Sequence, residues 1–151
     1  MKTDFKVEED VIRYFREETK HALFFQSLKV VGVGVPDVLL SCRLTGPFFA
    51  EFKLVDSDTA KIPWRKAQLP WASQFIKEGG KSVAVIADKK TGDVWVINMC
   101  NVEESDTLAT IKSKEFLQKK WNTDQWFHPH LVFFRVLFYQ DSFLPRLASA
   151  H

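Results

Sequence analysis

The sequence has few of the residues that mark several special classes of protein. It contains only two cysteines, Cys42 and Cys100, which lie far apart and lack the spacing of metal ligands. This excludes a disulfide framework and a cysteine-based zinc site, and we expect two buried thiols in a reducing compartment. Six glycines and six prolines among 151 residues are too few for a collagen-like or low-complexity chain.

Long apolar runs and a leader segment are also missing. The apolar run at residues 131–139 is interrupted by Arg135 and is too short to cross a bilayer. Residues 1–4 lack the apolar stretch of a signal peptide. We therefore expect no membrane partner and a cytoplasmic protein, in a bacterial cell or a phage-infected host cell.

No strong excess of either charge is present. The formal net charge is +2, which by itself does not indicate a nucleic-acid partner. Any phosphate binding would depend on local clusters of basic residues. These clusters are Lys61, Arg65 and Lys66; Lys77 and Lys81; and Lys112, Lys114, Lys119 and Lys120. Each cluster alone is more typical of a solvated helix or loop face.

The remaining composition, 46% hydrophobic and 26% charged, is that of a single globular domain spanning residues 1–151. Residue periodicity predicts the following elements. Helices are expected at 6–19, 63–77 and 106–121, and strands at 22–31, 38–41, 48–55, 83–87, 94–97 and 131–139. Asp4 or Thr3 is expected to cap the first helix, and Pro70 to kink the second or delay its start. This order favours an α/β fold in which a mixed sheet is flanked by helices.

Two charged residues stand out on the apolar strand at 48–55. Alternate side chains of a strand share a face, so Glu51 and Lys53 lie on one face, roughly 7 Å apart. Burial of unpaired charges costs several kcal/mol, so this strand needs compensation. Asp37, at the start of the preceding strand, is a candidate second carboxylate. Two carboxylates suit Mg²⁺, which binds few protein ligands and keeps several waters. The alternative is a turn aspartate and a surface Glu–Lys ion pair.

The spacing of these residues resembles a known signature. The run from Val33 through Pro36-Asp37, thirteen further residues, and then Glu51-Phe52-Lys53 is similar to the motif of PD-(D/E)XK nucleases. Gln68 in the next expected helix also occurs in the expected order. The resemblance is to the VRR-NUC branch and to phage-type Holliday junction resolvases, and covers about residues 4–97. It implies a restriction-endonuclease-like fold, to which residues 98–151 would add a C-terminal helix-strand extension.

The resemblance also implies roles for individual residues. Asp37, Glu51 and the backbone carbonyl of Phe52 would bind Mg²⁺ or Mn²⁺, and Lys53 would position or deprotonate the attacking water. Gln68 would support Lys53 or contact phosphate. The family often adds an acid from the first helix, for which Glu8 is the first choice and Asp4 and Glu9 are the alternatives.

Four residues near Gln68 are candidates for DNA contacts: Lys61, Trp64, Arg65 and Lys66. Trp64 could stack on an exposed base, although such a tryptophan is more often part of the core. His128 and His130 offer only a weak metal-site pattern, because no carboxylate motif accompanies them. Trp121, Trp126 and Phe127 favour a core extension or a dimer surface.

The expected function is therefore a metal-dependent endodeoxyribonuclease. Kinship with junction resolvases suggests a homodimer that acts on branched DNA such as Holliday junctions, because two cuts need two sites. Within the enzymes, the alternative is a nickase or a flap- or end-processing nuclease. From another class, the alternative is a non-catalytic DNA-binding module that kept the fold.

Overall fold

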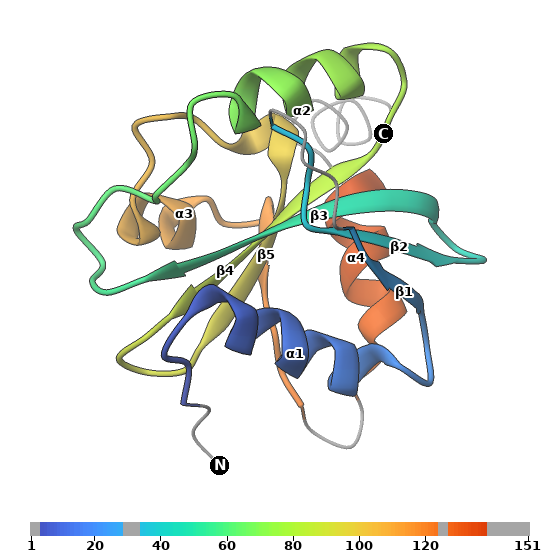
Figure 1. Cartoon of the computed structure of the whole chain (residues 1–151), viewed down its shortest axis with the longest axis horizontal. Helices are drawn as coiled ribbons and strands as arrows, with labels where there is room; N and C mark the ends of the chain where they lie inside the picture. Colours follow the sequence, from blue (N-terminus) through green and yellow to red (C-terminus); the bar gives the residue numbers. More distant parts are fainter. Residues whose placement is uncertain (1–3, 29–33, 124–126, 139–151) are drawn as a thin grey trace, which may run out of the picture.

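The structure, a computed structural model, describes residues 4–28, 34–123 and 127–138. Its centre is a six-stranded mixed sheet in which the strands follow one another in chain order, as Figure 1 shows. The strands are β1 Phe24–Ser27, β2 Val38–Cys42, β3 Gly46–Val55, β4 Ser82–Asp88, β5 Val94–Asn98 and β6 Gln118–Lys120. The helices are α1 Glu8–Thr19, α2 Gln68–Lys77, α3 Leu108–Ser113 and α4 Pro129–Phe138, with a 3₁₀ turn, η1, at Met99–Asn101. The expected α/β class, with a mixed sheet flanked by helices, is confirmed.

The pairing of β3 with β4 is parallel, whereas the other four neighbouring pairs are antiparallel. A parallel pair needs a long crossover connection, and here that connection contains α2. The register places Glu51 opposite Ala84 and Lys53 opposite Ile86. The pairing of β3 with β2 ends at Ala50, so Glu51 and Lys53 lie just beyond it, where β3 pairs with β4 alone.

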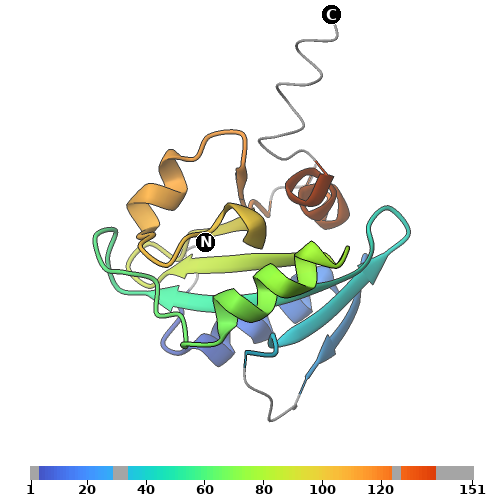
Figure 2. The ribbon, with the colours of Figure 1, turned by 90° about the horizontal axis from the view of Figure 1, so that it is seen from above.

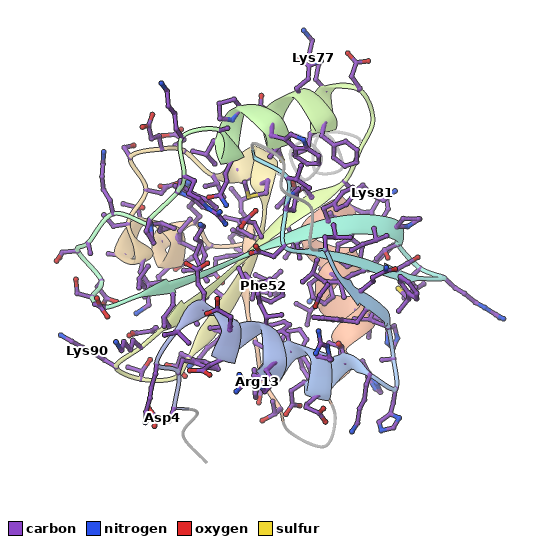
Figure 3. All side chains as sticks on the ribbon, viewed as in Figure 1. Asp4, Arg13, Phe52, Lys77, Lys81 and Lys90 are labelled. Atoms are coloured by element: carbon purple, nitrogen blue, oxygen red, sulfur yellow. The ribbon has the colours of Figure 1, made fainter. Side chains whose placement is uncertain are left out.

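Two hydrophobic clusters cover the two faces of the sheet. On one face, α1 and α4 pack with residues such as Phe15, Phe52 and Phe133. On the other face, α2, η1 and α3 pack on Ala84 and Ile86. Figures 1 and 2 show α1 and α2 on opposite sides of the sheet. In Figure 3, Phe52 lies in the packed layer beside α1, and charged residues such as Lys77 and Lys90 extend outward. The sheet is therefore the middle layer of three.

The helix starts differ from the expected ones. The carboxylate of Asp10, inside α1, accepts the backbone N–H groups of Lys6 and Val7, at 2.9 and 3.0 Å. Asp4 therefore does not cap α1, and Thr3 lies outside the described residues. Helix α2 begins at Gln68 rather than at residue 63, so the expected delay is confirmed. Pro70 fits in the first turn, where its missing N–H has no helical partner to lose.

Two predictions for the C-terminal third are wrong. The helix expected at 106–121 ends at Ser113, and residues Gln118–Lys120 instead form β6 at the sheet edge. Between them Phe116 has φ +73°, a conformation that interrupts a helix. The strand expected at 131–139 is helix α4 as far as Phe138, and Tyr139 lies outside the described residues. The expected helix-strand extension is therefore a helix, a strand and a second helix.

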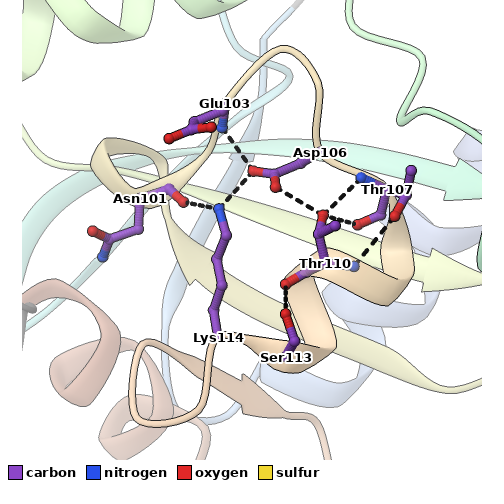
Figure 4. A network of polar contacts seen from close by, with 7 residues as sticks. All are labelled: Asn101, Glu103, Asp106, Thr107, Thr110, Ser113 and Lys114. Carbon is purple, nitrogen blue, oxygen red and sulfur yellow. Dashed lines mark hydrogen bonds and ion pairs between the residues drawn. The ribbon is translucent and has the colours of Figure 1, made fainter.

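A network of polar contacts fixes the segment between η1 and α3, as Figure 4 shows. Asp106 is buried, and its Oδ2 lies 2.6 Å from Nζ of Lys114. The same Oδ2 accepts the backbone N–H of Glu103 at 2.7 Å, and Oδ1 accepts the Thr110 hydroxyl at 2.8 Å. The buried carboxylate is thus neutralised and hydrogen-bonded, as a buried charge requires.

The expectations for the C-terminal tryptophans and the two cysteines have different outcomes. Trp121 is buried and its ring lies 4.2 Å from that of Phe15, between centroids, so it extends the core. Trp126 lies outside the described residues. The expectation of two buried thiols is wrong, because Cys42 is half-buried and Cys100 is exposed. Within the described ranges, no helix combines the length and apolar character needed to cross a bilayer.

Candidate active site

Glu51 and Lys53 are buried on the α2 side of β3. Their relative exposures are only 2% and 1%, although both side chains carry ionisable groups. Phe52 between them faces the opposite cluster with α1, as strand alternation requires. A pair of buried ionisable groups at the centre of a sheet is costly, so the surrounding contacts must compensate for it.

Asp37 provides the first of these contacts. It directly precedes β2, and its Oδ2 accepts the backbone N–H of Phe52 at 3.0 Å. Its carboxylate also lies within hydrogen-bonding reach of the carboxyl group of Glu51. The backbone carbonyl of Asp37 accepts the N–H of Leu28 at 2.8 Å, which ties the residue to the end of β1. The structure therefore brings the two predicted carboxylates together.

Gln68, the first residue of α2, holds Glu51 from the other side. Its Nε2 donates to Oε1 of Glu51 at 2.8 Å, and its own Oε1 accepts the backbone N–H of Arg65 at 2.8 Å. Gln68 is itself buried. The sequence placed this residue near the site but named Lys53 or phosphate as its partner, and Glu51 was missed. A tertiary contact of this kind leaves no signal in residue spacing.

The environment of Glu51 changes its acidity. Burial, followed by the hydrogen bond with Asp37 and the negative charge of Asp37, raises the pKa of Glu51 to about 9. The charges of Lys53 and Arg65 act in the opposite direction but do not outweigh burial. Without a cation, Glu51 is therefore protonated at neutral pH and donates its proton to Asp37. Two carboxyl groups that share one site raise the pKa of one of them in this way, and perturbed pKa values cluster at functional sites.

Lys53, although buried, is one of the residues that line a surface groove. The groove has a volume of about 610 Å³, and its lining includes Lys53, Glu8, Arg65 and Lys89. Among the described residues, no carboxylate lies within ion-pair distance of Lys53. Its Nζ instead lies 5.6 Å from the ring centroid of Trp64. We call this the Lys53 groove.

The first helix contributes Glu8 to the same region. Glu8 lines the Lys53 groove and is half-buried. Burial raises the pKa of Glu8, with Lys53 lowering it and Asp37 raising it further, so Glu8 lies within electrostatic reach of both. Glu9 lines the same groove but is exposed, and Asp4 lines a different groove beside Arg13. Of the three acids considered, Glu8 alone combines partial burial with a position in the Lys53 groove.

Basic residues surround the buried carboxyl groups. Arg65 and Lys66 are exposed and line a second groove of about 610 Å³, together with Gln68 and Gly34. Arg65 lines both grooves and therefore lies between them. Lys61 is also exposed, but it lines neither groove and its backbone pairs with Thr107. The groove at Gln68 is lined by basic residues without acidic ones, whereas the Lys53 groove is lined by both, including Glu8, Glu9 and Asp56.

The donor set can be tested against the expected divalent cation. Within the described residues, no group of three or more His, Cys, Asp or Glu side chains is arranged to hold a metal ion. This arrangement does not suit Zn²⁺, which takes a closed set of protein ligands in structural sites. Two carboxyl groups that share a proton do suit Mg²⁺ or Mn²⁺, because a hard cation with several waters can replace that proton. The rings of His128 and His130 lie 5.7 Å apart, and the described residues offer them no third ligand.

Comparisons with known proteins do not add to this picture. No protein-family model matches the chain, and a search of curated proteins finds no match. The functional argument therefore depends on the geometry of the site.

Proposed function

We propose that this protein is a divalent-metal-dependent endodeoxyribonuclease of the PD-(D/E)XK type, with a restriction-endonuclease-like fold. The observation that supports it best is the pair formed by the half-buried Asp37 and the buried Glu51, with the buried Lys53 on the same strand face as Glu51 and in the lining of a charged groove. A surface ion pair, the simpler alternative, does not account for a buried lysine without a carboxylate partner. The mixed sheet with β3 at its centre is compatible with the proposed fold.

Each residue has a distinct task in this proposal. Asp37, Glu51 and the carbonyl of Phe52 would hold Mg²⁺ or Mn²⁺, which when bound activates water and neutralises charge on phosphate. Lys53 would orient or deprotonate the attacking water and stabilise the charge that develops on the phosphate. Gln68 keeps the Glu51 carboxyl group directed toward Asp37. Glu8 adds negative charge beside Lys53, and Arg65 and Lys66 bind neighbouring phosphates.

The proposed substrate is branched DNA such as a Holliday junction, cut by a homodimer that provides two active sites. A nickase or a flap- or end-processing nuclease is the alternative within the enzymes. A non-catalytic DNA-binding module is the alternative outside them, and the buried charges argue against it. A module without catalysis gains nothing from a carboxyl pair that costs folding free energy.

The decisive experiment incubates the purified protein with a four-way junction, a flap, a duplex and a single strand, each in Mg²⁺, Mn²⁺ or EDTA. We expect cleavage in Mg²⁺ or Mn²⁺ and none in EDTA, with the junction cut fastest. Preference for the flap would identify the end-processing alternative. Binding to DNA without cleavage in either metal would favour the non-catalytic module and contradict the proposed function.

Variants of the carboxyl pair provide the residue-level test. Asp37→Asn and Glu51→Gln keep the side-chain size and should each abolish cleavage while leaving the circular dichroism spectrum unchanged. Asp93→Asn is the matched control, because Asp93 lies in the β4–β5 connection and pairs with Lys120 outside the site. Normal cleavage by a folded Asp37→Asn or Glu51→Gln protein would refute the metal-site assignment.

A further inference from the structure

A short segment at residues 62–68 contacts both Glu51 and Lys53 of β3. At one end, the backbone N–H of Ile62 donates to the carbonyl of Asp106 at 3.2 Å, and the Ile62 side chain is buried. At the other end, Gln68 accepts the N–H of Arg65 and donates to Glu51. Trp64 lies between these anchors, and its own N–H donates to the carbonyl of Ile62 at 2.8 Å. The position of its indole ring is thus fixed by the backbone on both sides.

The face of that ring lies beside the ammonium group of Lys53, whose Nζ is 5.6 Å from the ring centroid. A cation at this distance is attracted by the quadrupole of the ring, and the attraction is stronger when water is excluded. Lys53 is 1% exposed, so little water surrounds the contact. No carboxylate among the described residues forms an ion pair with Lys53. Glu8 and Glu51 act on it electrostatically from beyond that distance, whereas the Trp64 ring faces the ammonium group itself.

Trp64 is half-buried and packs against the hydrophobic cluster on the α2 face of the sheet. Pro63 and Arg65, its neighbours in the chain, line the Lys53 groove, whereas Trp64 is not part of that lining. Its Nε1 is buried, with no hydrogen-bond acceptor in the described part of the chain. A ring that stacks on a DNA base needs an exposed face, so the surroundings favour contact with Lys53 over contact with DNA.

We propose that Trp64 is a positioning residue for Lys53, whose indole face directs the ammonium group toward the groove and the scissile phosphate. Together, Trp64 and Gln68 would let one segment orient both Lys53 and Glu51. This inference rests on the proposed nuclease function. The role differs from DNA binding, because it affects the rate of the chemical step and leaves affinity for DNA unchanged.

The test compares Trp64→Leu with the conservative Trp64→Phe on a labelled four-way junction under single-turnover conditions. Trp64→Leu should lower the cleavage rate by about tenfold, since cation–π contacts contribute on this scale when desolvated. Trp64→Phe keeps an aromatic face and should retain most of the rate. The dissociation constant for the same junction, measured in Ca²⁺ to prevent cleavage, should stay within about twofold for both variants.

A double-mutant cycle separates positioning from general packing. In a Lys53→Met background, Trp64→Leu should cause no further loss of rate, because the group that it positions is gone. Trp95→Leu is the matched control: this ring lies 4.6 Å from Nζ of Lys112, and its change should leave the rate per folded molecule unaltered. Additive losses, or an equal loss in the control, would show a structural role only and overturn the proposal. So would a loss confined to affinity, which would identify base stacking.

A second readout does not depend on cleavage. The ring of Trp64 should shift the NMR signals of the Lys53 CεH₂ group upfield, and Trp64→Leu should abolish this shift while Trp64→Phe keeps part of it. If Trp64→Leu fails to fold, Trp64→Met replaces it. A wild-type protein without the shift overturns the contact itself. A protein that shows the shift but cuts none of the DNA substrates refutes the proposed function and leaves the contact standing, so the two failures are distinguishable.

Discussion

Among the described lysines, Lys53 alone is buried, and it lies two residues from Glu51 on the same face of β3. Most lysine side chains extend into water, because burial of an unpaired ammonium group is unfavourable. Here the chain keeps the charge inside without a carboxylate ion pair in the described residues. The free energy lost to this arrangement has to be offset elsewhere, which is common for residues that take part in chemistry.

Lys53→Met tests this role directly. Met retains most of the side-chain volume and removes the charge, so the single-turnover cleavage rate should fall on the order of 10²-fold or more. Affinity for DNA in Ca²⁺ should change far less, because one phosphate contact is a small part of the binding free energy. Lys90→Met, at an exposed lysine of the β4–β5 connection, is the control. A variant that cleaves normally, or whose defect lies entirely in affinity, would remove the proposed role.

The sequence located the centre of this site but not its supporting contacts. Asp37, Glu51 and Lys53 could be found because strand alternation places Glu51 and Lys53 on one face, and Asp37 lies at the start of the adjacent strand. The hydrogen bond from Gln68 to Glu51 and the ring of Trp64 beside Lys53 could not be predicted. They depend on how the segment before α2 returns to the sheet, which local patterns do not determine.

At the scale of secondary-structure elements, Gly34 sets the distance between the start of β2 and the start of α2. It has φ +84°, and a Cβ at this position would lie 2.3 Å from the carbonyl oxygen of Ala67. Any larger residue would therefore push Asp37 away from Glu51 and the first turn of α2. The glycine is required both for its backbone conformation and for the close approach.

Gly34→Ala should lower the free energy of unfolding by about 2 kcal/mol or more, measured by urea titration. Gly79→Ala is a matched control, because Gly79 has φ +96° but nothing lies within 4 Å of its added Cβ. In that variant the free energy of unfolding should fall by only about 1 kcal/mol, the cost of the conformational strain alone. We also expect the cleavage rate to fall in Gly34→Ala and not in Gly79→Ala. Equal losses of stability in the two variants would show that the close approach is unimportant.

The connection between η1 and α3 depends on the charge of Asp106. Burial would raise its pKa, but hydrogen bonds from Lys114, the N–H of Glu103 and Thr110 outweigh burial and lower the pKa below its ordinary value. Because the folded protein holds the carboxylate charged, this group stabilises the fold above its ordinary pKa of about 4. The stabilisation is lost as the pH falls through the lowered pKa of the folded state.

Asp106→Asn should therefore be less stable than the wild type by about 1 to 3 kcal/mol at pH 7, where it leaves Lys114 without its charged partner. The difference should be similar at pH 5 and should shrink below about pH 4, where the wild-type carboxylate also becomes protonated. Urea unfolding at pH 7, 5 and 3 measures it. A difference that does not change with pH would show that the charge of Asp106 is unimportant.

The elements that the sequence predicted wrongly share a physical cause. The run that forms α4 is rich in Val and Phe, which favour strands, and a short, mostly apolar run does not distinguish a strand from a buried helix. Its buried residues, Phe133, Val136 and Leu137, nevertheless follow helical spacing, and Pro129 occupies the first helical position. That proline was the signal available in the sequence. Nothing comparable marked the end of α3, because a positive φ at a phenylalanine, as at Phe116, has no signature in the sequence.

At the scale of the whole molecule, the proposed homodimer needs a surface, and α4 provides a candidate. Leu131 and Phe138 on this helix are exposed, at 43% and 40%, whereas Trp121 is in the core. We expect a dimer by light scattering at micromolar concentration, and Leu131→Glu should convert it to a folded monomer. Gln74→Glu, on the exposed side of α2, is the control. A wild-type monomer that makes paired symmetric cuts in a junction would contradict the dimer.

The parallel pairing of β3 with β4 has a consequence for how fast the chain folds. Every other strand pair joins neighbours by a short or moderate connection, but this pair must close the loop that contains α2. Loop closure costs entropy before any contact repays it, so contacts between residues far apart in sequence form slowly. We expect the docking of β3 on β4 to limit the folding rate. Substitutions in the contact between β3 and β4 should then slow refolding in stopped-flow experiments, while substitutions in α4 should mainly speed unfolding.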